Sequence, residues 1–226
     1  MEIKPIGIVR TDFKEKFGIP RQSGRIEEIE GTIEFYPPYC AKDYFKGIEQ
    51  YSHLWILWGF SENEKKKKHA TVRPPRLGGN TRIGVFASRS PFRPNDLALS
   101  CVNLKEMRIS GGNCTLIIGG ADMLDSSPVY DIKPYIAYTD CIPNAKSGFA
   151  QESKNHALEI CGDLSQLQIL PAEKQKALLK ILADDPRPAY QDDENRIYGF
   201  VYAGYEIKFR VKGTRLELKE IAKEQK

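Results

Sequence analysis

The sequence is poor in the residues that build metal sites and disulfide frameworks. It contains three histidines and five cysteines among 226 residues, and the cysteines are widely spaced, with no CxxC pair. An odd number of scattered cysteines argues against a disulfide framework or a zinc ribbon and is typical of free thiols in a reducing cytosol. The histidines do not cluster with cysteines or carboxylates at metal-ligand spacing, so we expect no bound metal.

Three common catalytic signatures are also missing, as are long apolar runs. There is no GxGxxG after a strand, no P-loop and no GxSxG, which excludes the usual dinucleotide-binding, NTPase and serine-hydrolase patterns. No apolar run approaches the ~18 residues that a membrane-spanning helix needs. The first residues, MEIKPIGIVRTD, lack the pattern of a signal peptide. We therefore expect a soluble, cytoplasmic protein that does not enter a membrane.

Acidic residues are absent from the whole segment between Lys65 and Asn95, although the chain overall has 34 Lys+Arg against 30 Asp+Glu. A loop that needs only solubility mixes charges of both signs. This segment instead carries nine basic residues, interleaved with prolines and glycines that fix the shape of the backbone. It predicts a surface for phosphate or carboxylate groups, while a merely solvated basic loop remains the alternative.

The pattern of short apolar segments favours a mainly β fold. Strands are predicted at residues 3–10, 25–36, 52–60, 81–89, 97–109 and 113–124, with a short helix at 40–50. The segment 52–60 is apolar throughout, so we expect it to be buried on both faces. Ser110, Gly111 and Gly112 form a good tight-turn sequence between two of the strands. Many short strands with few helices indicate an antiparallel barrel or sandwich.

The pattern changes after Pro143. A helix is predicted at 171–185, followed by a proline-rich loop and a strand pair at 196–211 and 214–223. This is the pattern of a small α+β domain, so we divide the chain into residues 1–142 and 143–226.

Three polar segments are too specific in composition to be simple connectors. They are PRQSG at 20–24, the arginine-rich segment at 73–95, and DMLDSSPVYDIKPY at 122–135. Arginines at the end of a strand lie at one rim of a sheet, where binding residues gather. The first segment can also be an ordinary hairpin loop, and Asp131 and Lys133 can be a structural ion pair. The run Lys65 to Lys68 is either a flexible phosphate contact or a solvated tip.

These segments, together with YSHLWILW and DDPRPAY, resemble the TrmO family, also called TsaA-like or YaeB-like proteins, in collinear order over nearly the whole chain. The resemblance implies a methyltransferase that uses S-adenosylmethionine, has an N-terminal antiparallel β-barrel in place of a Rossmann domain, and acts as a homodimer. It also implies the substrate, which is N6 of threonylcarbamoyl-adenosine at position 37 of threonine tRNA. Neither the cofactor nor the substrate follows from composition.

The resemblance also transfers a cofactor site onto this sequence. Its residues are Pro20, Arg21, Gln22, Ser61, Glu62, Arg89, Leu99, Asp125, Ser126, Ser127 and Pro128. Two places depart from the family pattern, because Ser61-Glu62 stands where His-Gln is frequent and Ser126-Ser127 where Gly-Thr is common. Contacts through the backbone survive such changes, whereas contacts through side chains need not.

Methyl transfer to an amide-like nitrogen is helped by a group that accepts its proton. We expect Asp131 to do so, with Lys133 or Tyr135 orienting the modified base. A single-stranded anticodon loop is read by stacking bases on flat side chains and by basic residues along its backbone. Phe92, Tyr130 and Tyr135 are candidate planes. Candidate contacts to the anticodon arm of the tRNA are Lys65, Lys66, Lys67, Lys68, Arg73, Arg76, Arg93, Arg187 and Tyr190.

Two other functions compete with this one. A non-catalytic RNA- or nucleotide-binding barrel can use the same arginines without transferring a group, and cofactor binding would distinguish it. An enzyme for a small anionic metabolite explains the arginines, but neither the lysine run nor the C-terminal domain.

Overall fold

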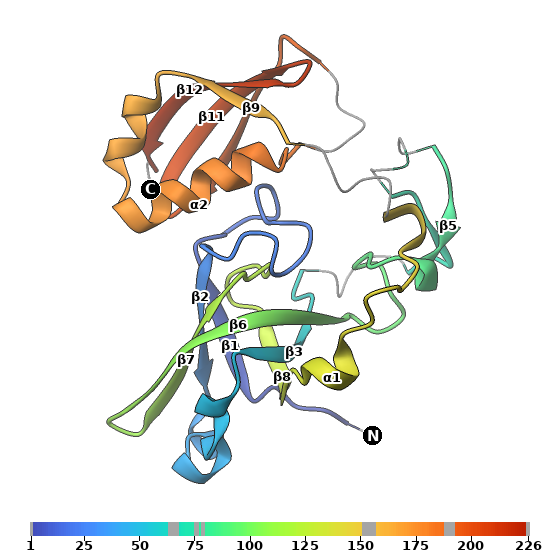
Figure 1. Ribbon diagram of the computed structural model, residues 1–226, viewed down its shortest axis with the longest axis vertical. Helices are drawn as coiled ribbons and strands as arrows, with labels where there is room; N and C mark the ends of the chain where they lie inside the picture. Colours follow the sequence, from blue (N-terminus) through green and yellow to red (C-terminus); the bar gives the residue numbers. More distant parts are fainter. Residues whose placement is uncertain are drawn as a thin grey trace.

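Six antiparallel strands in the first part of the chain close into a barrel (Figure 1). A computed structural model describes residues 2–62, 68–74, 77, 80–150, 157–187 and 193–224. The barrel strands are β1 (Gly7–Thr11), β2 (Glu30–Phe35), β3 (His53–Gly59), β6 (Leu97–Ser110), β7 (Asn113–Gly119) and β8 (Pro128–Pro134). They follow the order β1-β2-β7-β6-β3-β8, and β8 pairs back with β1. The expectation of an N-terminal antiparallel barrel is therefore confirmed.

Strand β3 shows how this barrel leaves room for a site. Leu54, Ile56 and Trp58 point inward and are buried, whereas Trp55 and Leu57 are only half-buried on the outer face. Side chains alternate between the two faces of a strand, so an apolar outer face needs its own cover. The prediction that segment 52–60 is buried on both faces is wrong, because His53, Trp55 and Leu57 on the outer face are only half-buried.

The hairpin between β6 and β7 agrees with its sequence. Gly111 and Gly112 have φ angles of 57° and 81°, as a two-residue turn with left-handed backbone requires. Ser110 and Asn113 face each other across the turn.

Several predicted elements differ from the structure. Residues 37–50 form three 3₁₀ turns, η1 (Pro37–Tyr39), η2 (Lys42–Phe45) and η3 (Ile48–Gln50), in place of one helix. Within the predicted strand 81–89, only β5 (Ile83–Gly84) is a strand, and it pairs with β4 (Thr71–Val72). The 3₁₀ turn η5 (Val85–Ala87) follows it. Strand β8 was not predicted, because its polar residues and two prolines are unusual in a strand. It pairs with β3 along most of its length, so pairing in the barrel overrides local preference.

The C-terminal part is a small α+β unit, as expected. Its sheet has the order β10-β11-β12-β9, and helix α2 packs its apolar side toward this sheet (Figure 1). The strands are β9 (Glu159–Gly162), β10 (Ile197–Tyr202), β11 (Tyr205–Lys212) and β12 (Arg215–Lys223), and the helical elements after the barrel are α1 (Ala137–Asp140), η6 (Gly148–Ala150), η7 (Leu164–Ile169) and α2 (Ala172–Ala183). The predicted strand 196–211 is two strands, separated by a turn at Ala203 and Gly204. In the described part of the chain, no helix has the length and apolar character needed to span a membrane.

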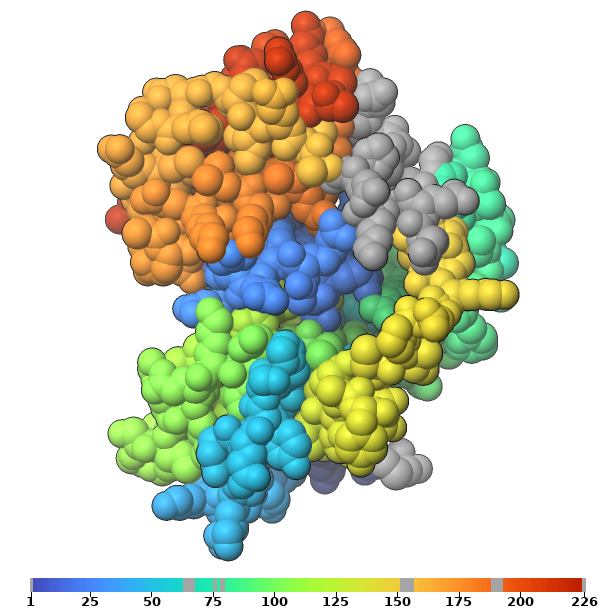
Figure 2. All heavy atoms as spheres, in the orientation of Figure 1, coloured from blue at the N-terminus to red at the C-terminus, as the bar shows by residue number. Residues whose placement is uncertain are grey.

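The segment between β1 and β2 lies between the barrel and the C-terminal unit (Figure 2). The Phe17 ring lies 5.9 Å from the Phe200 ring, and the Phe13 ring lies 5.5 Å from the Tyr202 ring. At its other end, Lys174 of α2 donates to Asp12 at 2.5 Å. This segment also carries the PRQSG sequence, so the same loop serves the interface and the candidate site.

Glu28 at the end of this segment predicts a pH dependence of stability. Its carboxylate contacts Lys180 at 2.6 Å and Lys176 at 2.9 Å, and these two ammonium groups lower its pKa from 4.5 to about 2. A depressed carboxyl pKa stabilises the fold above about pH 4.5, and the contribution is lost as the pH falls toward 2. We expect Glu28→Gln to lower the melting temperature at pH 7, with a deficit that shrinks below pH 4.5. Glu49→Gln, at an exposed position, is the control. If the melting temperature of Glu28→Gln is lowered by the same amount at every pH, the ion pairs are not the cause.

Candidate active site

A pocket of about 650 Å³ opens where β3 ends and β6 begins. Its walls come from five stretches of the chain, within residues 16–22, 55–62, 88–93, 97–100 and 122–127. All three polar segments singled out in the sequence contribute to it. Tertiary structure thus brings together residues more than a hundred positions apart.

The floor of the pocket is apolar and belongs to the outer face of the barrel. Trp55 and Leu57 of β3 lie beside Leu97 and Leu99 of β6, and Leu57 is paired directly with Leu99. Leu99 is 57% exposed, which is unusual for a leucine in the middle of two paired strands. A flat apolar floor of this kind suits an aromatic ring or an aliphatic chain.

One wall of the pocket is a chain of hydrogen bonds that joins two of the polar segments. The Arg89 guanidinium donates to the Gln22 side-chain oxygen, and the Gln22 amide donates to the Arg21 carbonyl at 2.5 Å. No ion pair of Arg89 occurs among the described residues. Its positive charge is therefore available to an anionic ligand.

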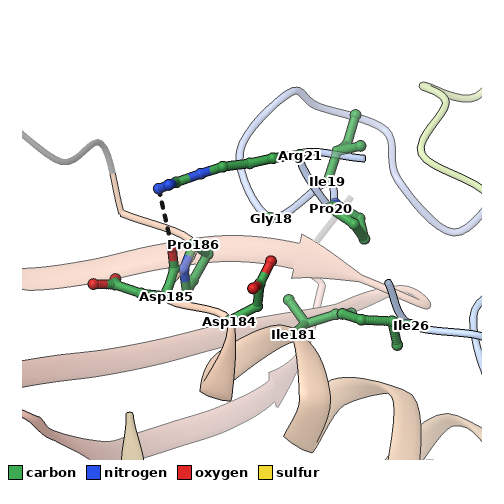
Figure 3. Close-up of a pocket in the computed structure, with 9 residues that line it drawn as sticks. All are labelled: Gly18, Ile19, Pro20, Arg21, Ile26, Ile181, Asp184, Asp185 and Pro186. Carbon is green, nitrogen blue, oxygen red and sulfur yellow. Dashed lines mark hydrogen bonds between the residues drawn. The ribbon is translucent and has the colours of Figure 1, made fainter. Parts of the chain in front are cut away.

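Arg21 connects this wall to the C-terminal unit. Its Nη2 donates to the carbonyl oxygens of Arg187, at 2.6 Å, and Asp185, at 3.2 Å. Figure 3 shows the Arg21 side chain extending from the Gly18–Arg21 loop toward Asp185, over a small cavity between the two units. The guanidinium of Arg21 is thus held by backbone carbonyls, and only part of its donor set is left for a ligand.

Arg93 is held in a comparable way on the opposite wall. Its Nη1 donates to the carbonyls of Ser88, at 2.7 Å, and Val85, at 3.3 Å. The guanidinium lies 5.9 Å from the centre of the Phe86 ring, and that ring is 78% exposed. Arg93, predicted as a tRNA contact, lines the pocket itself. Phe86 is an exposed plane beside the pocket that the sequence pattern did not reveal, because it lies in a stretch that reads as a strand.

Asp122, which opens the polar segment 122–135, lines the pocket although it is not among the predicted cofactor or catalytic residues. Trp58 Nε1 donates to Ser100 Oγ at 2.9 Å, and Ser100 Oγ donates to Asp122 Oδ1 at 2.6 Å. Burial raises the pKa of Asp122, although hydrogen bonds from Ser100 and from backbone amides and the charge of Arg89 act in the opposite direction. A partly buried carboxylate in an apolar-floored pocket is typical of a functional group.

The segment 125–128 contributes less to the pocket than the resemblance predicts. Ser127 lines it, whereas Asp125, Ser126 and Pro128 lie outside its lining. The Asp125 carboxylate accepts from the Thr11 amide at 3.0 Å and pairs with Lys14 at 2.8 Å. Burial raises the pKa of Asp125, but these partners outweigh burial and the net pKa is lowered. Asp125 thus fastens β1 to the loop before β8, and its cofactor contact remains a prediction.

The other predicted cofactor residues come together. Pro20, Arg21, Gln22, Ser61, Glu62, Arg89, Leu99 and Ser127 all line the pocket. Glu62 pairs with Lys16, another lining residue, at 3.3 Å.

Two of the three predicted catalytic residues, Asp131 and Lys133, lie on β8, and Tyr135 follows the end of that strand; none of the three lines the pocket. Asp131 is paired with Leu57 across the two strands, and Lys133 with Trp55. Asp131 and Lys133 form an ion pair of 2.9 Å, the structural alternative that the sequence left open. The Tyr135 ring lies 5.7 Å from that of Trp55. These residues therefore extend the same outer face of the barrel from the pocket floor onto β8.

The predicted tRNA contacts lie in different environments. Arg73 is exposed, and Lys68 pairs with Asp96. Arg187 is only 8% exposed, and Asp185 binds its guanidinium at 2.9 and 3.0 Å, so in this conformation it is not presented to a phosphate backbone. Lys65, Lys66, Lys67, Arg76 and Tyr190 lie outside the described residues.

Comparisons with known proteins point to one family. The model of the tRNA-methyltransferase O N-terminal domain matches residues 8–141, and that of the TrmO C-terminal domain matches residues 153–224. The chain is 37% identical to the tRNA (adenine(37)-N6)-methyltransferase of Escherichia coli, over 96% of each chain. It is 39% identical to a putative S-adenosylmethionine-dependent methyltransferase, RcsF, of Pseudomonas aeruginosa, over 87% of each. The crystal structure of TrmO from Pseudomonas aeruginosa superposes with a TM-score of 0.78 and 28% identity, over 98% of both chains.

Proposed function

Because this chain belongs to the TrmO family of S-adenosylmethionine-dependent tRNA (adenine-N6)-methyltransferases, we propose that its substrate is the threonylcarbamoyl-adenosine at position 37 of threonine tRNA. The methyl group of S-adenosylmethionine is transferred to N6 of that base. The observation that supports this function best is the single pocket in which an apolar floor meets Arg21, Arg89 and Asp122.

The chemistry of the pocket fits S-adenosylmethionine. The floor of Trp55, Leu57 and Leu99 is suited to the adenine ring, and the guanidinium of Arg89, which forms no ion pair with the described residues, is suited to the carboxylate of the methionine part. A volume of about 650 Å³ lies in the range of pockets that hold small molecules. Gln22 fixes the direction of Arg89 before the ligand arrives, which lowers the entropic cost of binding.

The cofactor supplies a methyl group on a positively charged sulfur, which is a good leaving group. The protein therefore needs no covalent nucleophile. Its work is to hold the acceptor nitrogen in line with the methyl group and to keep water out of the pocket. The apolar floor and the adjoining loops serve both purposes.

We place the proton acceptor on β8. N6 loses a proton when it gains the methyl group, and the Asp131 carboxylate, directly opposite Leu57, is near enough to the pocket floor to be a candidate for accepting it. Lys133 and Tyr135 lie on the same face and are candidates for orienting the threonylcarbamoyl group.

The surface around β4 and β5 is the proposed contact with the anticodon arm. Arg73 is exposed there, and Phe86 offers an exposed aromatic plane on which an unpaired base can stack. The C-terminal sheet is less suited to phosphates, because its basic side chains are matched by acidic neighbours. Lys208 pairs with Glu220 at 2.8 Å, and Arg210 pairs with Glu217 at 2.7 Å. Contact of the C-terminal unit with tRNA would therefore have to use its loops.

Arg73 allows a direct test of this surface. We expect Arg73→Gln to weaken tRNA binding and to reduce the slope of log K against log salt by about one, because one phosphate contact is lost. Lys46→Gln, which removes an exposed charge from the 40–50 segment, should leave both unchanged. Binding is measured by fluorescence anisotropy at several salt concentrations. Equal effects of the two variants would show that only total charge matters.

We also propose that the protein acts in the cytoplasm as a homodimer. Large apolar side chains are exposed in the N-terminal part of the chain, among them Leu99 in the pocket, Phe86, and Tyr138, which is 91% exposed. A second copy that covers part of this surface would shield the pocket from water. Light scattering combined with size-exclusion chromatography measures the mass in solution.

Mass spectrometry of nucleosides tests the function as a whole. Threonine tRNA carrying the modification is incubated with the protein and S-adenosylmethionine bearing a labelled methyl group. We expect the label on N6 of threonylcarbamoyl-adenosine at position 37, and none on tRNA that lacks the threonylcarbamoyl group. If cofactor and tRNA bind but no label is transferred, the protein is a non-catalytic RNA-binding barrel.

A further inference from the structure

Asp122 is held in one orientation within the pocket. The indole nitrogen of Trp58 can only donate, so Ser100 Oγ must be the acceptor of their 2.9 Å hydrogen bond. The Ser100 hydroxyl proton is then directed to Asp122 Oδ1, 2.6 Å away. Trp58 and Ser100 are both nearly fully buried, at 5% and 1% exposed. The Asp122 carboxylate is therefore held by the buried Ser100 hydroxyl, which Trp58 in turn fixes.

Asp122 differs from the other acid in the pocket. The acidic residues in the lining are Glu62 and Asp122. Glu62 already pairs with Lys16 at 3.3 Å, and its side chain is 55% exposed. For Asp122, no ion pair within 4.0 Å is formed by the described residues, and Arg89 is the cation whose field it feels. A desolvated carboxylate without a close counter-ion is costly unless a ligand supplies one.

Arg89 and Asp122 thus place a fixed cation and a fixed anion in the same pocket. A ligand with a carboxylate at one end and a positive centre elsewhere matches this arrangement, whereas a simple anion would be repelled by Asp122. S-adenosylmethionine has such charges, and its sulfonium loses its charge when the methyl group leaves. S-adenosylhomocysteine, which remains, keeps the same carboxylate and ammonium groups but has a neutral sulfur.

We propose that Asp122 is the counter-ion of the sulfonium, so that the pocket binds the cationic methyl donor more tightly than the neutral product. This inference rests on the proposed function and assigns to Asp122 a role in selecting the charge state of the ligand. The product would leave more readily because the attraction ends with the transfer. Since the sulfonium charge decreases as the reaction proceeds, Asp122 would help binding and not the chemical step.

Calorimetry with the full-length protein and two ligands tests this role. We expect the wild type to bind S-adenosylmethionine at least about 10-fold more tightly than S-adenosylhomocysteine, because a partly buried charge pair is lost with the second ligand. Asp122→Asn should remove most of this preference by weakening only the first ligand, with the second changed less than about two-fold. Asp43→Asn, outside the pocket lining, should keep the preference.

Kinetics separate the counter-ion from a general base. With Asp122→Asn, we expect a higher KM for S-adenosylmethionine and an unchanged or higher kcat at saturation. A fall in kcat with unaltered ligand affinity would make Asp122 a proton acceptor and overturn the proposal. If Asp122→Asn weakens the binding of both ligands equally, Asp122 contacts the ammonium group that they share. This result would also overturn the proposal.

Wild-type measurements alone can decide the matter if the variant does not fold. Equal affinity of the wild type for the two ligands overturns the proposal without any substitution. A wild type that binds neither ligand overturns the proposed function, and the inference with it. Methyl transfer by a wild type that lacks the charge preference leaves the function in place and removes only the inference.

Discussion

Replacing Arg89 with alanine is expected to raise the dissociation constant of S-adenosylmethionine by about 30-fold or more, because truncating one partner of a desolvated charge pair costs ~2–5 kcal/mol. Arg89 lines the pocket, is oriented by Gln22, and forms no ion pair with the described residues. Its removal leaves the ligand carboxylate without its main counter-charge. It also removes the positive field that lowers the pKa of Asp122, so that pKa rises further. Isothermal titration calorimetry measures the affinity.

Two further variants test whether the loss of affinity is specific to the Arg89 guanidinium. Arg108→Ala removes an exposed arginine on β6 that pairs with Glu106 at 2.7 Å, and it should not change cofactor affinity. Arg89→Lys keeps the charge but loses the two-pronged geometry of the guanidinium, so an intermediate affinity is expected. Unchanged cofactor affinity in Arg89→Ala would remove this residue from the site and, with it, the strongest support for the placement of the cofactor.

Gly18→Ala is expected to destabilise the protein by ~2–4 kcal/mol, from a left-handed backbone and from overpacking. Gly18 has a φ of +91°, and a Cβ there would lie 2.4 Å from Cδ2 of Phe200. Phe200 is 1% exposed, and its ring contacts those of Phe17 and Phe209, so it has little room to move. The loop that carries Arg21 and Gln22 would be displaced from the C-terminal unit. Thermal unfolding should show a melting temperature lower by several degrees, together with weaker cofactor binding.

Gly111 provides the matched control for this substitution. It has a φ of +57° in the β6–β7 turn, and a Cβ there would meet no atom within 4 Å. Gly111→Ala therefore carries the backbone strain alone, roughly 1–2 kcal/mol, and should not affect the cofactor. The difference between the two variants measures the clash with Phe200. If both lose the same stability and both keep cofactor affinity, the loop does not couple the C-terminal unit to the pocket.

The fold could be predicted from the sequence where local signals agree with one another. The β6–β7 hairpin has two glycines in its turn, and α2 has Pro171 at its start and an apolar stripe toward the sheet. Predictions failed where pairing in three dimensions overrides local preference. Strand β8 is polar and contains prolines, yet it closes the barrel between β1 and β3.

By itself, the sequence determined the fold class, the acid-free basic segment and the three polar segments that contribute to the pocket. These follow from composition, periodicity and motifs, which depend on neighbours along the chain. Only the tertiary structure decided that the outer face of β3 is a pocket floor and that Asp122 lines the same pocket as Arg89. It also decided that Arg187 is buried in an ion pair. Burial and electrostatic environment depend on which distant segments meet, and closure of the barrel and packing of the C-terminal unit on the 12–28 segment bring those segments together.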